Sequence, residues 1–234
     1  MISVCLTTYN GAKHVKEQID SILTQLGEND ELIVSDDCSI DATISIISSM
    51  NDERIKVFMN EKNIGYTRNF ERTLSLARGD IIFLSDQDDV WCQNKIKTYL
   101  HYFDDYDIIV SDAMLINEEG NLLNDSFFSQ RNPQKTIFGN LLKFGYLGCC
   151  MAFKREILMK ALPFPSNSNL CTHDNWLFLI GCCFFKYKIL EEKLLLYRRH
   201  INNISNGGLQ NTTSILFKIH YRLYLIFHLI CRIL

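Results

Sequence analysis

Three carboxylates within four residues, Asp86, Asp88 and Asp89, are the side chains of this sequence best suited to chemistry. Acids this close repel one another unless a cation shares them, and clusters of oxygen ligands suit Mg²⁺ or Mn²⁺. The apolar run at residues 81–84 directly precedes them and has the length of a buried parallel strand. Ligands of open α/β sheets bind beyond the carboxyl ends of such strands. The stretch therefore predicts a divalent-cation site, with a solvated acidic turn before a helix as the alternative.

Three further polar clusters follow predicted strands or begin a predicted helix. Residues 7–11 offer hydroxyls, an amide and a glycine turn that can approach a base or a ribose. Residues 35–41 place carboxylates where they can accept hydrogen bonds from a base or a ribose. Residues 63–69 run into a helix N-terminus with an arginine nearby, which favours phosphate. Each cluster alone is ordinary turn or cap chemistry, but four in this order indicate a nucleotide site.

Strand and helix signals alternate through the first half of the chain, which must position these clusters. The predicted strands are residues 2–7, 31–35, 54–59 and 81–84. The predicted helices are residues 14–26, 41–50 and 66–77. Strands separated by helices of this length form βαβ units with right-handed crossovers. We therefore expect an α/β fold with a mainly parallel central sheet flanked by helices.

The second half has a mixed α+β pattern. The predicted elements are a helix at 94–103, a strand at 107–111, a hairpin of 113–116 with 121–123, a strand at 147–153, a helix at 175–185, and strands at 188–190 and 194–198. No low-complexity linker separates the halves, so we predict one continuous fold.

Composition limits the class of protein. A net charge of −3 gives no support for a nucleic-acid partner, which would need a basic surface. The nine cysteines form no Cys-x-x-Cys pair, a pattern that suits buried thiols in a reducing cytosol. Strand-like sequence beginning at Ile2 leaves no room for a signal peptide. We therefore expect a cytoplasmic protein.

The tail, residues 214–234, contains no acid and many large apolar side chains. Drawn as a helix, it places Lys218, Arg222, His228 and Arg232 within a sector of roughly 120°. Its charge-free run 223–227 is far shorter than the roughly 20 residues that cross a bilayer. A basic amphipathic helix can lie in a membrane interface. A terminal helix docked on the domain or on a second subunit is the alternative.

The ordered motifs of this sequence, at residues 8–10, 36–43, 63–65 and 86–88, resemble those of family 2 nucleotide-sugar glycosyltransferases of the GT-A fold. The extended form at 86–91 is most similar to the bacterial rhamnosyltransferase-like branch. The resemblance covers about residues 1–205, with Cys38 where the family usually has glycine. It implies one Rossmann-like GT-A domain at 1–210, with a nucleotide-binding half at about 1–112 and an acceptor half at about 113–210. Residues 211–234 form the basic amphipathic helix.

The resemblance also implies roles for individual residues. Those implied to bind the nucleotide sugar are Thr8, Tyr9, Asn10, Asp36, Asp37, Arg68, Asn69, Asp86, Gln87 and Arg198. Those implied to hold Mn²⁺ or Mg²⁺ are Asp86, Asp88 and His200. The cation would neutralise charge that builds on the departing diphosphate. Asp174 would be the general base, although an acid at a helix start is also a common N-cap.

The implied reaction is an inverting, metal-dependent sugar transfer. The donor suggested by the rhamnosyltransferase-like motif is dTDP-L-rhamnose, and the acceptor is a hydroxyl of a glycan or a lipid-linked precursor in bacterial surface polysaccharide synthesis. A UDP-hexose donor and a non-catalytic nucleotide-sugar-binding protein are the alternatives. A nucleotidyltransferase would carry a Gly-rich phosphate loop after the first strand, which residues 8–11 do not form. We expect no nucleic-acid partner, and a peripheral position on the inner face of the plasma membrane.

Overall fold

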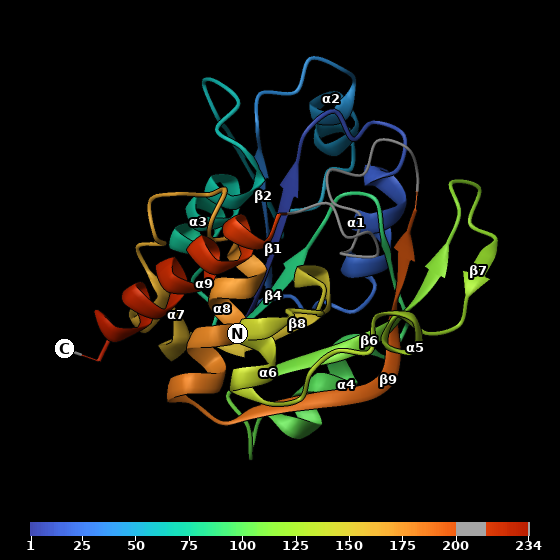
Figure 1. Ribbon diagram of the computed structural model, residues 1–234. Coiled ribbons are helices and arrows are strands. Elements are labelled where there is room, and N and C mark those ends of the chain that lie inside the picture. Colours follow the sequence, from blue (N-terminus) through green and yellow to red (C-terminus); the bar gives the residue numbers. More distant parts are fainter. Residues whose placement is uncertain (200–213, 234) are drawn as a thin grey trace.

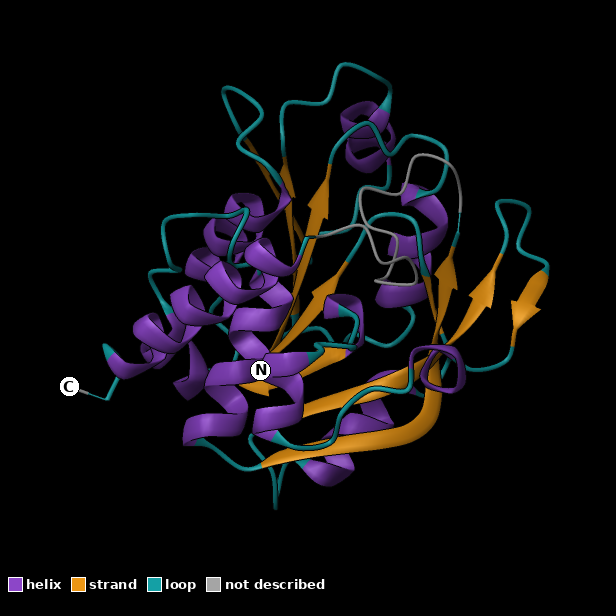
Figure 2. Ribbon diagram, in the orientation of Figure 1, coloured by secondary structure: helices purple, strands orange, loops and turns teal. Residues whose placement is uncertain are grey.

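The computed structural model describes residues 1–199 and 214–233, which form a nine-stranded mixed sheet with helices on both faces (Figures 1 and 2). The strands lie in the order β3-β2-β1-β4-β8-β6-β9-β5, and β7 pairs with β6 beside this path. The predicted α/β fold is confirmed. Within the described residues, no helix combines the length and the apolar content needed to cross a bilayer.

Four parallel strands form the first half of the sheet. They are β1 (Ile2–Thr8), β2 (Glu31–Asp36), β3 (Ile55–Met59) and β4 (Ile81–Ser85). Their crossovers contain α1 (Val15–Leu23), α2 (Thr43–Ser49) and α3 (Tyr66–Leu76). Every residue of β1 and β2 is buried, which is why both read as apolar runs. Thr8 pairs with Asp36 and Leu6 pairs with Ser85, so the carboxyl ends of β1, β2 and β4 meet at one edge.

The second half adds antiparallel pairing to this sheet. The short β8 (Met151–Lys154) lies antiparallel between β4 and β6 (Ile108–Ile116). The long β9 (Tyr187–Arg198) runs parallel to β6 and antiparallel to β5 (Val90–Trp91), and β7 (Leu122–Asn124) forms a hairpin with β6. Figure 1 shows β9 curving up the sheet toward the edge where β1 and β4 end. Its last residue, Arg198, thereby reaches residues 86–89, hereafter the acidic loop.

Three predicted boundaries are corrected. The strands predicted at 107–111 and 113–116 form the single strand β6, and those at 188–190 and 194–198 form β9, because register shifts let the pairing continue through the polar residues between them. The strand predicted at 147–153 begins with a 3-10 turn, Gly148–Cys150. Carbonyls of that turn accept hydrogen bonds from the side chains of Lys95 (2.7 Å) and Tyr99 (2.6 Å) instead of from a neighbouring strand.

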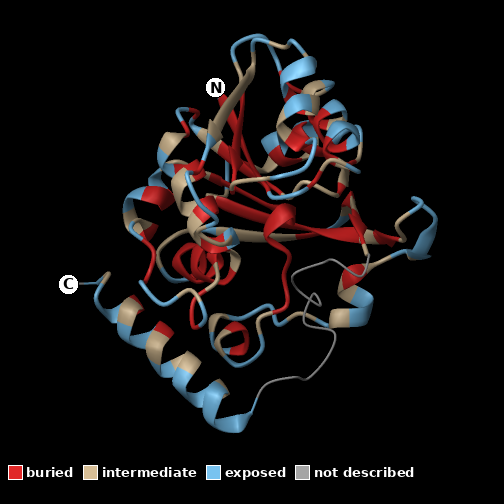
Figure 3. Ribbon diagram, turned by 90° about the horizontal axis from the view of Figure 1, so that it is seen from above, coloured by how far each residue is buried: buried red, intermediate tan, exposed pale blue. Residues whose placement is uncertain are grey.

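The remaining helices are α4 (Lys95–Tyr102), α5 (Phe127–Arg131), α6 (Ile137–Leu142), α7 (Glu156–Ala161), α8 (His173–Phe184) and α9 (Ile215–Ile230). Helices α5, α6 and α7 escaped prediction because five or six residues are too few to establish a helical period. Helix α8 begins two residues before the predicted start, and its residues 175–182 are all buried. Figure 3 shows the buried residues gathered along the sheet and the helices packed on it, with α9 at the outside of the molecule.

Candidate functional site

A cavity of about 660 Å³ opens at the carboxyl edge of the parallel strands. The predicted site residues that line it are Thr8, Tyr9, Asn10, Asp37, Asn69, Asp86, Gln87, Asp88 and Asp174. The first half supplies all of these except Asp174, which comes from α8. Asp36, Arg68 and Arg198 do not line the cavity. His200 lies outside the described residues, so its role as a metal ligand stays a prediction.

Asp36 holds together the loops that follow β1 and β2. Its buried carboxylate accepts hydrogen bonds from the Thr8 hydroxyl (2.7 Å) and from the amide (2.8 Å) and hydroxyl (2.5 Å) of Ser39. Asn10 joins the same loops, because its amide donates to Ser39 and its side chain accepts from Ile40. Asp36 therefore shapes the cavity edge from behind it.

Gln87 positions Tyr9 on the cavity wall. The Tyr9 amide donates to Gln87 Oε1 at 2.8 Å, and Gln87 Nε2 donates to the Tyr9 carbonyl at 3.0 Å. A Cβ at Gly11 would lie 2.2 Å from Gln87 Oε1, so this pairing requires glycine there. The Tyr9 side chain stays exposed at the cavity. Its ring is thus available to a planar ligand such as a base.

Asp37 orders the loop that leads into α3. Its carboxylate accepts from the amides of Ile64 (2.8 Å) and Gly65 (2.9 Å) and from the Asn60 side chain (2.8 Å). Gly65 has φ of 84°, a left-handed conformation that favours glycine. Buried Asn69 ties α3 to β2 through hydrogen bonds with Ser35. Protein contacts alone therefore hold the cavity wall formed by the ends of β1 and β2 and the start of α3.

Arg68 is directed away from the cavity. Its guanidinium pairs with Glu71 one turn further along α3 and donates to the carbonyl of Pro165 at 2.6 Å. These contacts tie α3 to the loop between α7 and α8. The predicted role of Arg68 near the base or the diphosphate of the nucleotide sugar therefore has no support in the arrangement of this side chain.

Arg198 clamps the acidic loop from behind. Its side chain donates to the carbonyl of Asp88 (2.8 Å), to the carbonyl of Glu118 (3.0 Å) and to the carboxylate of Glu17 (2.7 Å). Its amide donates to Asp89 Oδ1 at 3.0 Å. Arg198 is 2% exposed and lies outside the cavity lining, and its guanidinium is hydrogen-bonded to these protein groups.

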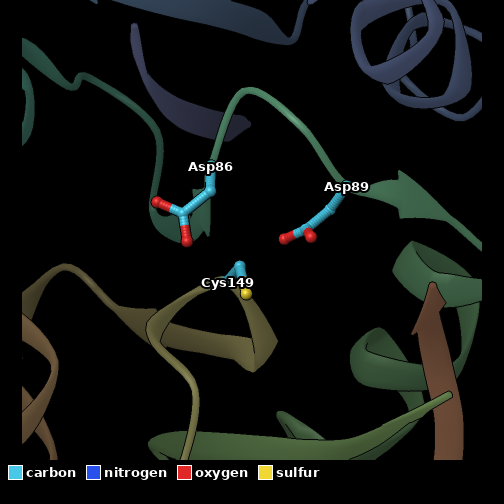
Figure 4. A group of neighbouring side chains, drawn as sticks. All are labelled: Asp86, Asp89 and Cys149. Atoms are coloured by element: carbon cyan, nitrogen blue, oxygen red, sulfur yellow. The ribbon is translucent and has the colours of Figure 1, made fainter. Parts of the chain in front are cut away.

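The acidic loop presents Asp86 and Asp88 to the cavity and keeps Asp89 buried. Oxygen atoms of Asp86 and Asp89 and the sulfur of Cys149 lie within 4.8 Å of one another. Figure 4 shows both carboxylates turned toward Cys149, which comes from the 3-10 turn before β8. Asp89 Oδ2 is buried without a hydrogen-bond partner in the described part of the chain.

The electrostatics of this loop fit a hard divalent cation. Burial, followed by the charges of Asp88 and Asp174, raises the pKa of Asp86 to about 7. Burial and the charges of Asp88 and Asp86 also raise the pKa of Asp89 well above its ordinary value. Burial raises the pKa of the Cys149 thiol as well, so the sulfur keeps its proton and suits a hard cation poorly. Asp86 and Asp88 are the oxygen ligands that this loop offers to the cavity.

Asp174 enters the cavity from the first turn of α8, where its Oδ1 accepts from the Asn175 amide at 2.8 Å. The neighbouring His173 also lines the cavity. Its ring stacks on Phe70, with centroids 3.9 Å apart, and neither ring nitrogen has a partner among residues 1–199 and 214–233. Burial lowers the pKa of His173, so the ring is neutral near pH 7. A Cβ at Gly148 would lie 2.7 Å from His173 Nε2, so glycine leaves room for this first turn.

Sequence reasoning missed several residues of the cavity wall. They are Lys13, His14, Tyr66, Glu118, His173 and Tyr197. Lys13 forms an ion pair with Glu118 of the β6–β7 hairpin, which closes that side of the cavity. The position of Lys13 and His14 directly after the predicted cluster at 7–11 was an available signal. Tyr66 within the predicted cluster at 63–69 and His173 directly before Asp174 carried the same signal. Glu118 and Tyr197 reach the cavity through tertiary packing, which local sequence does not reveal.

Two glycosyltransferases are similar to this chain in sequence. This chain is 27% identical over 234 residues to the dTDP-rhamnosyl transferase RfbG of Shigella flexneri, covering 93% of this chain and 77% of RfbG. It is 27% identical over 165 residues to the UDP-Glc:alpha-D-GlcNAc-diphosphoundecaprenol beta-1,3-glucosyltransferase WfaP of Escherichia coli, covering 70% of this chain and 64% of WfaP. The chain thus spans somewhat less than two thirds of the length of WfaP.

The structure resembles S. aureus TarS 1-349 in complex with UDP-GlcNAc, with a TM-score of 0.75, 18% identity, and coverage of 98% of this chain and 66% of that one. It also resembles the mannosyltransferase PcManGT from Pyrobaculum calidifontis in complex with GDP-Man and Mn²⁺, with a TM-score of 0.63, 16% identity, and coverage of 96% and 69%. These likenesses agree with the expected GT-A fold. The model of the family "Glycosyl transferase family 2" matches residues 3–162, more than half of the chain, and the chain therefore belongs to glycosyl transferase family 2.

Proposed function

We propose that this protein transfers a sugar from a nucleoside-diphosphate donor to an acceptor hydroxyl with inversion at the sugar carbon. The observation that carries the proposal is the single cavity that gathers the Tyr9 and Asp37 wall, the carboxylates of Asp86 and Asp88, and Asp174. Donor binding, charge stabilisation and proton transfer each have a side chain in this space. A protein that only bound nucleotide sugars would have no use for Asp174 opposite the acidic loop.

The donor's nucleoside would lie on the wall formed by the ends of β1 and β2. Tyr9 offers an exposed ring for the base, held in place by Gln87. Asp37 accepts hydrogen bonds from the backbone amides of Ile64 and Gly65, and the Thr8 hydroxyl donates to the buried Asp36 carboxylate. A preformed wall of this kind lowers the conformational cost of binding. Asp36 would support this wall from behind, and Asn69, which lines the cavity, would tie α3 to it.

Asp86 and Asp88 would hold Mn²⁺ or Mg²⁺ next to the diphosphate. When bound, the cation neutralises charge on the phosphates of the leaving group. The raised pKa of Asp86 supports this role, because burial and nearby acids penalise its charge when no cation is present. Arg198 would act indirectly, by fixing the backbone of Asp88.

Asp174 would accept the proton of the acceptor hydroxyl. The hydroxyl oxygen forms a bond to the anomeric carbon while the bond from that carbon to the phosphate oxygen breaks. The proton passes to the Asp174 carboxylate, and the nucleoside diphosphate leaves with the bonding electrons. Because attack comes from the face opposite the leaving group, one displacement inverts the configuration.

The donor we propose is dTDP-L-rhamnose, on the basis of the extended motif at 86–91 and the likeness to RfbG. A UDP-hexose is the second candidate, because WfaP is named as a UDP-Glc-dependent enzyme and TarS was solved with UDP-GlcNAc. The acceptor we propose is lipid-linked, as the diphosphoundecaprenol in the name of WfaP suggests. The cytoplasmic localisation inferred from composition stays a prediction.

The test compares wild type, Asp174→Asn and Asp88→Ala in two assays. Thermal-shift titration with dTDP-L-rhamnose, UDP-glucose or UDP-GlcNAc and Mn²⁺ measures donor binding, and product NMR measures anomeric configuration. A donor present at 100 times its Kd stabilises a protein by about 2.7 kcal/mol. We expect Asp174→Asn to bind donor normally and to transfer no sugar, and Asp88→Ala to lose the Mn²⁺-dependent shift. A retained configuration, or full transfer by Asp174→Asn, would contradict the mechanism.

A further inference from the structure

Helix α9 is fastened to the domain by its basic side. The Arg222 guanidinium donates to the carbonyls of Leu141 (3.0 Å) and Leu142 at the end of α6. Arg232 donates to the carbonyl of Pro163 beyond α7. Leu225 and Leu229, on the same side of the helix, are buried in the core. The basic sector of this helix therefore faces the protein, as in the docked-helix alternative.

The opposite side of α9 is apolar, and nothing within residues 1–199 and 214–233 covers it. It presents Ile215, Leu216, Ile219, Leu223, Ile226, Phe227 and Ile230. At 100° per residue these side chains fall within an arc of roughly 120°, to which the sequence assigns no Lys, Arg, Asp or Glu. Figure 3 shows the exposed side of α9 along the outer edge of the molecule. Contiguous apolar surface of this kind marks an interaction site in a folded protein.

This helix lies beside the helix that carries the proposed base. His228 of α9 meets the Trp176 ring edge-on, with centroids 6.4 Å apart, and the Arg232 guanidinium lies 5.8 Å from the same ring. Trp176 is two residues from Asp174 on α8. Tyr221, on the inner side of α9, is close enough for the charge of Asp174 to add to the effect of burial in raising its pKa. The apolar face is thus on the outer side of a helix that lies beside α8, which carries Asp174, the proposed base.

We propose that the outer face of α9 lies on a lipid bilayer and so brings the cavity to an acceptor held in that bilayer. The inference rests on the proposed function, in which the acceptor is lipid-linked. A charge-free face suits the acyl boundary, and a helix of 16 residues, about 24 Å long, lies in the plane of a bilayer instead of crossing it. The arginines that such helices usually direct to headgroups are already bonded to protein carbonyls.

This arrangement sets the experiment. The variant Leu223→Glu/Phe227→Glu places two charges on the outer face, where these side chains are 60% and 61% exposed. The matched control is Leu122→Glu/Leu123→Glu on β7, where the side chains are 59% and 58% exposed. Figure 1 shows β7 on the opposite side of the molecule from α9. Because all four side chains are exposed, neither change should disturb folding, and thermal unfolding checks this.

Flotation with phosphatidylcholine vesicles and with phosphatidylglycerol vesicles measures binding. We expect the wild type and the control to bind both, with little effect of 0.5 M NaCl, because the contact is apolar. We expect the α9 variant to bind at least about tenfold more weakly, since each buried methylene contributes about 0.8 kcal/mol. Wild type that does not bind vesicles, or that binds only anionic vesicles at low salt, would overturn the proposal. So would a wild-type dimer that the α9 variant alone converts to monomer, because a second copy would then cover the face.

Thermal shift with the nucleotide sugars, run on the same three proteins without vesicles, separates the two proposals. We expect equal donor shifts in all three, since neither pair of substitutions touches the cavity. Vesicle binding without any donor shift would count against the proposed function and leave the membrane contact standing. A donor shift without vesicle binding would count against the membrane contact alone.

Discussion

Replacement of Arg198 by methionine tests whether this residue clamps the acidic loop or contacts the diphosphate. The substitution keeps most of the side-chain length and removes every donor. It should free the carbonyl of Asp88 and the hairpin carbonyl of Glu118, and leave the loop that carries Asp86 less fixed. We therefore expect weaker Mn²⁺ binding together with lower stability.

The size of the effect follows from the contacts. Hydrogen bonds that involve a charged group contribute about 1.5–3 kcal/mol each, and Arg198 makes two to partly buried carbonyls. The ion pair with Glu17 adds only about 0–1 kcal/mol, because Glu17 is 58% exposed and its charge is screened. A loss of about 3–7 kcal/mol lowers the Tm of a chain of this size by at least about 6 °C.

The assay combines thermal unfolding with calorimetric titration of Mn²⁺ and of dTDP. Arg78→Met is the matched control, since Arg78 is exposed, and we expect it to leave both measurements unchanged. If Arg198 contacted the diphosphate, Arg198→Met would lose dTDP affinity while its Tm stayed within about 2 °C of that of the wild type. That result would refute the clamp.

Three other predictions concern the cavity and the core. In Gly148→Ala, a Cβ 2.7 Å from His173 Nε2 shifts the first turn of α8, and we expect kcat to fall about 100-fold with donor affinity kept. Mn²⁺ affinity, measured by calorimetry, should weaken as the pH falls through about 7, because protons then compete for Asp86. Burial raises the pKa of Glu31, but hydrogen bonds from Lys56 and other groups outweigh burial, so the net pKa lies below its ordinary value. The charged Glu31 therefore stabilises the fold above pH 4.5, and this contribution is lost as the pH falls. Glu31→Gln should flatten the pH profile of the free energy of unfolding below pH 4.5, measured by urea unfolding.

The cavity wall at the ends of β1, β2 and β4 could be predicted, because its geometry follows from the pattern of apolar and polar residues in the sequence. The apolar runs at 2–7, 31–35 and 81–84 became β1, β2 and β4, and parallel pairing then forces their carboxyl ends together. Residues placed directly after those ends, such as Asp37 and Asp86, reach the cavity for that reason. Here the position in the sequence almost determines the position in space.

The arginines show where such reasoning stops. Arg68 and Arg198 lie near the expected segments, but the direction of a long side chain depends on partners from distant parts of the chain. The carbonyl of Pro165 draws Arg68 away from the cavity, and Glu17 with the carbonyl of Asp88 draws Arg198 behind the acidic loop. Those partners become neighbours only through tertiary packing. The same is true of Cys149, which meets Asp86 because β8 pairs antiparallel with β4.

The charge balance around the cavity supports the cation site that we propose. Asp86, Asp88 and Asp174 line one space, and Asp89 adds a fourth carboxylate directly behind it. Three cations near this space in the described part of the chain have protein partners: Lys13 pairs with Glu118, Lys95 donates to the carbonyl of Cys149, and Arg198 is bonded to carbonyls and to Glu17. A diphosphate entering this space would meet like charges, each pair at about 4 Å costing about 4 kcal/mol at an effective dielectric constant of 20. A divalent ion on Asp86 and Asp88, as we propose, would reverse that balance, and the acids that repel one another without it would then favour a metal-bound donor.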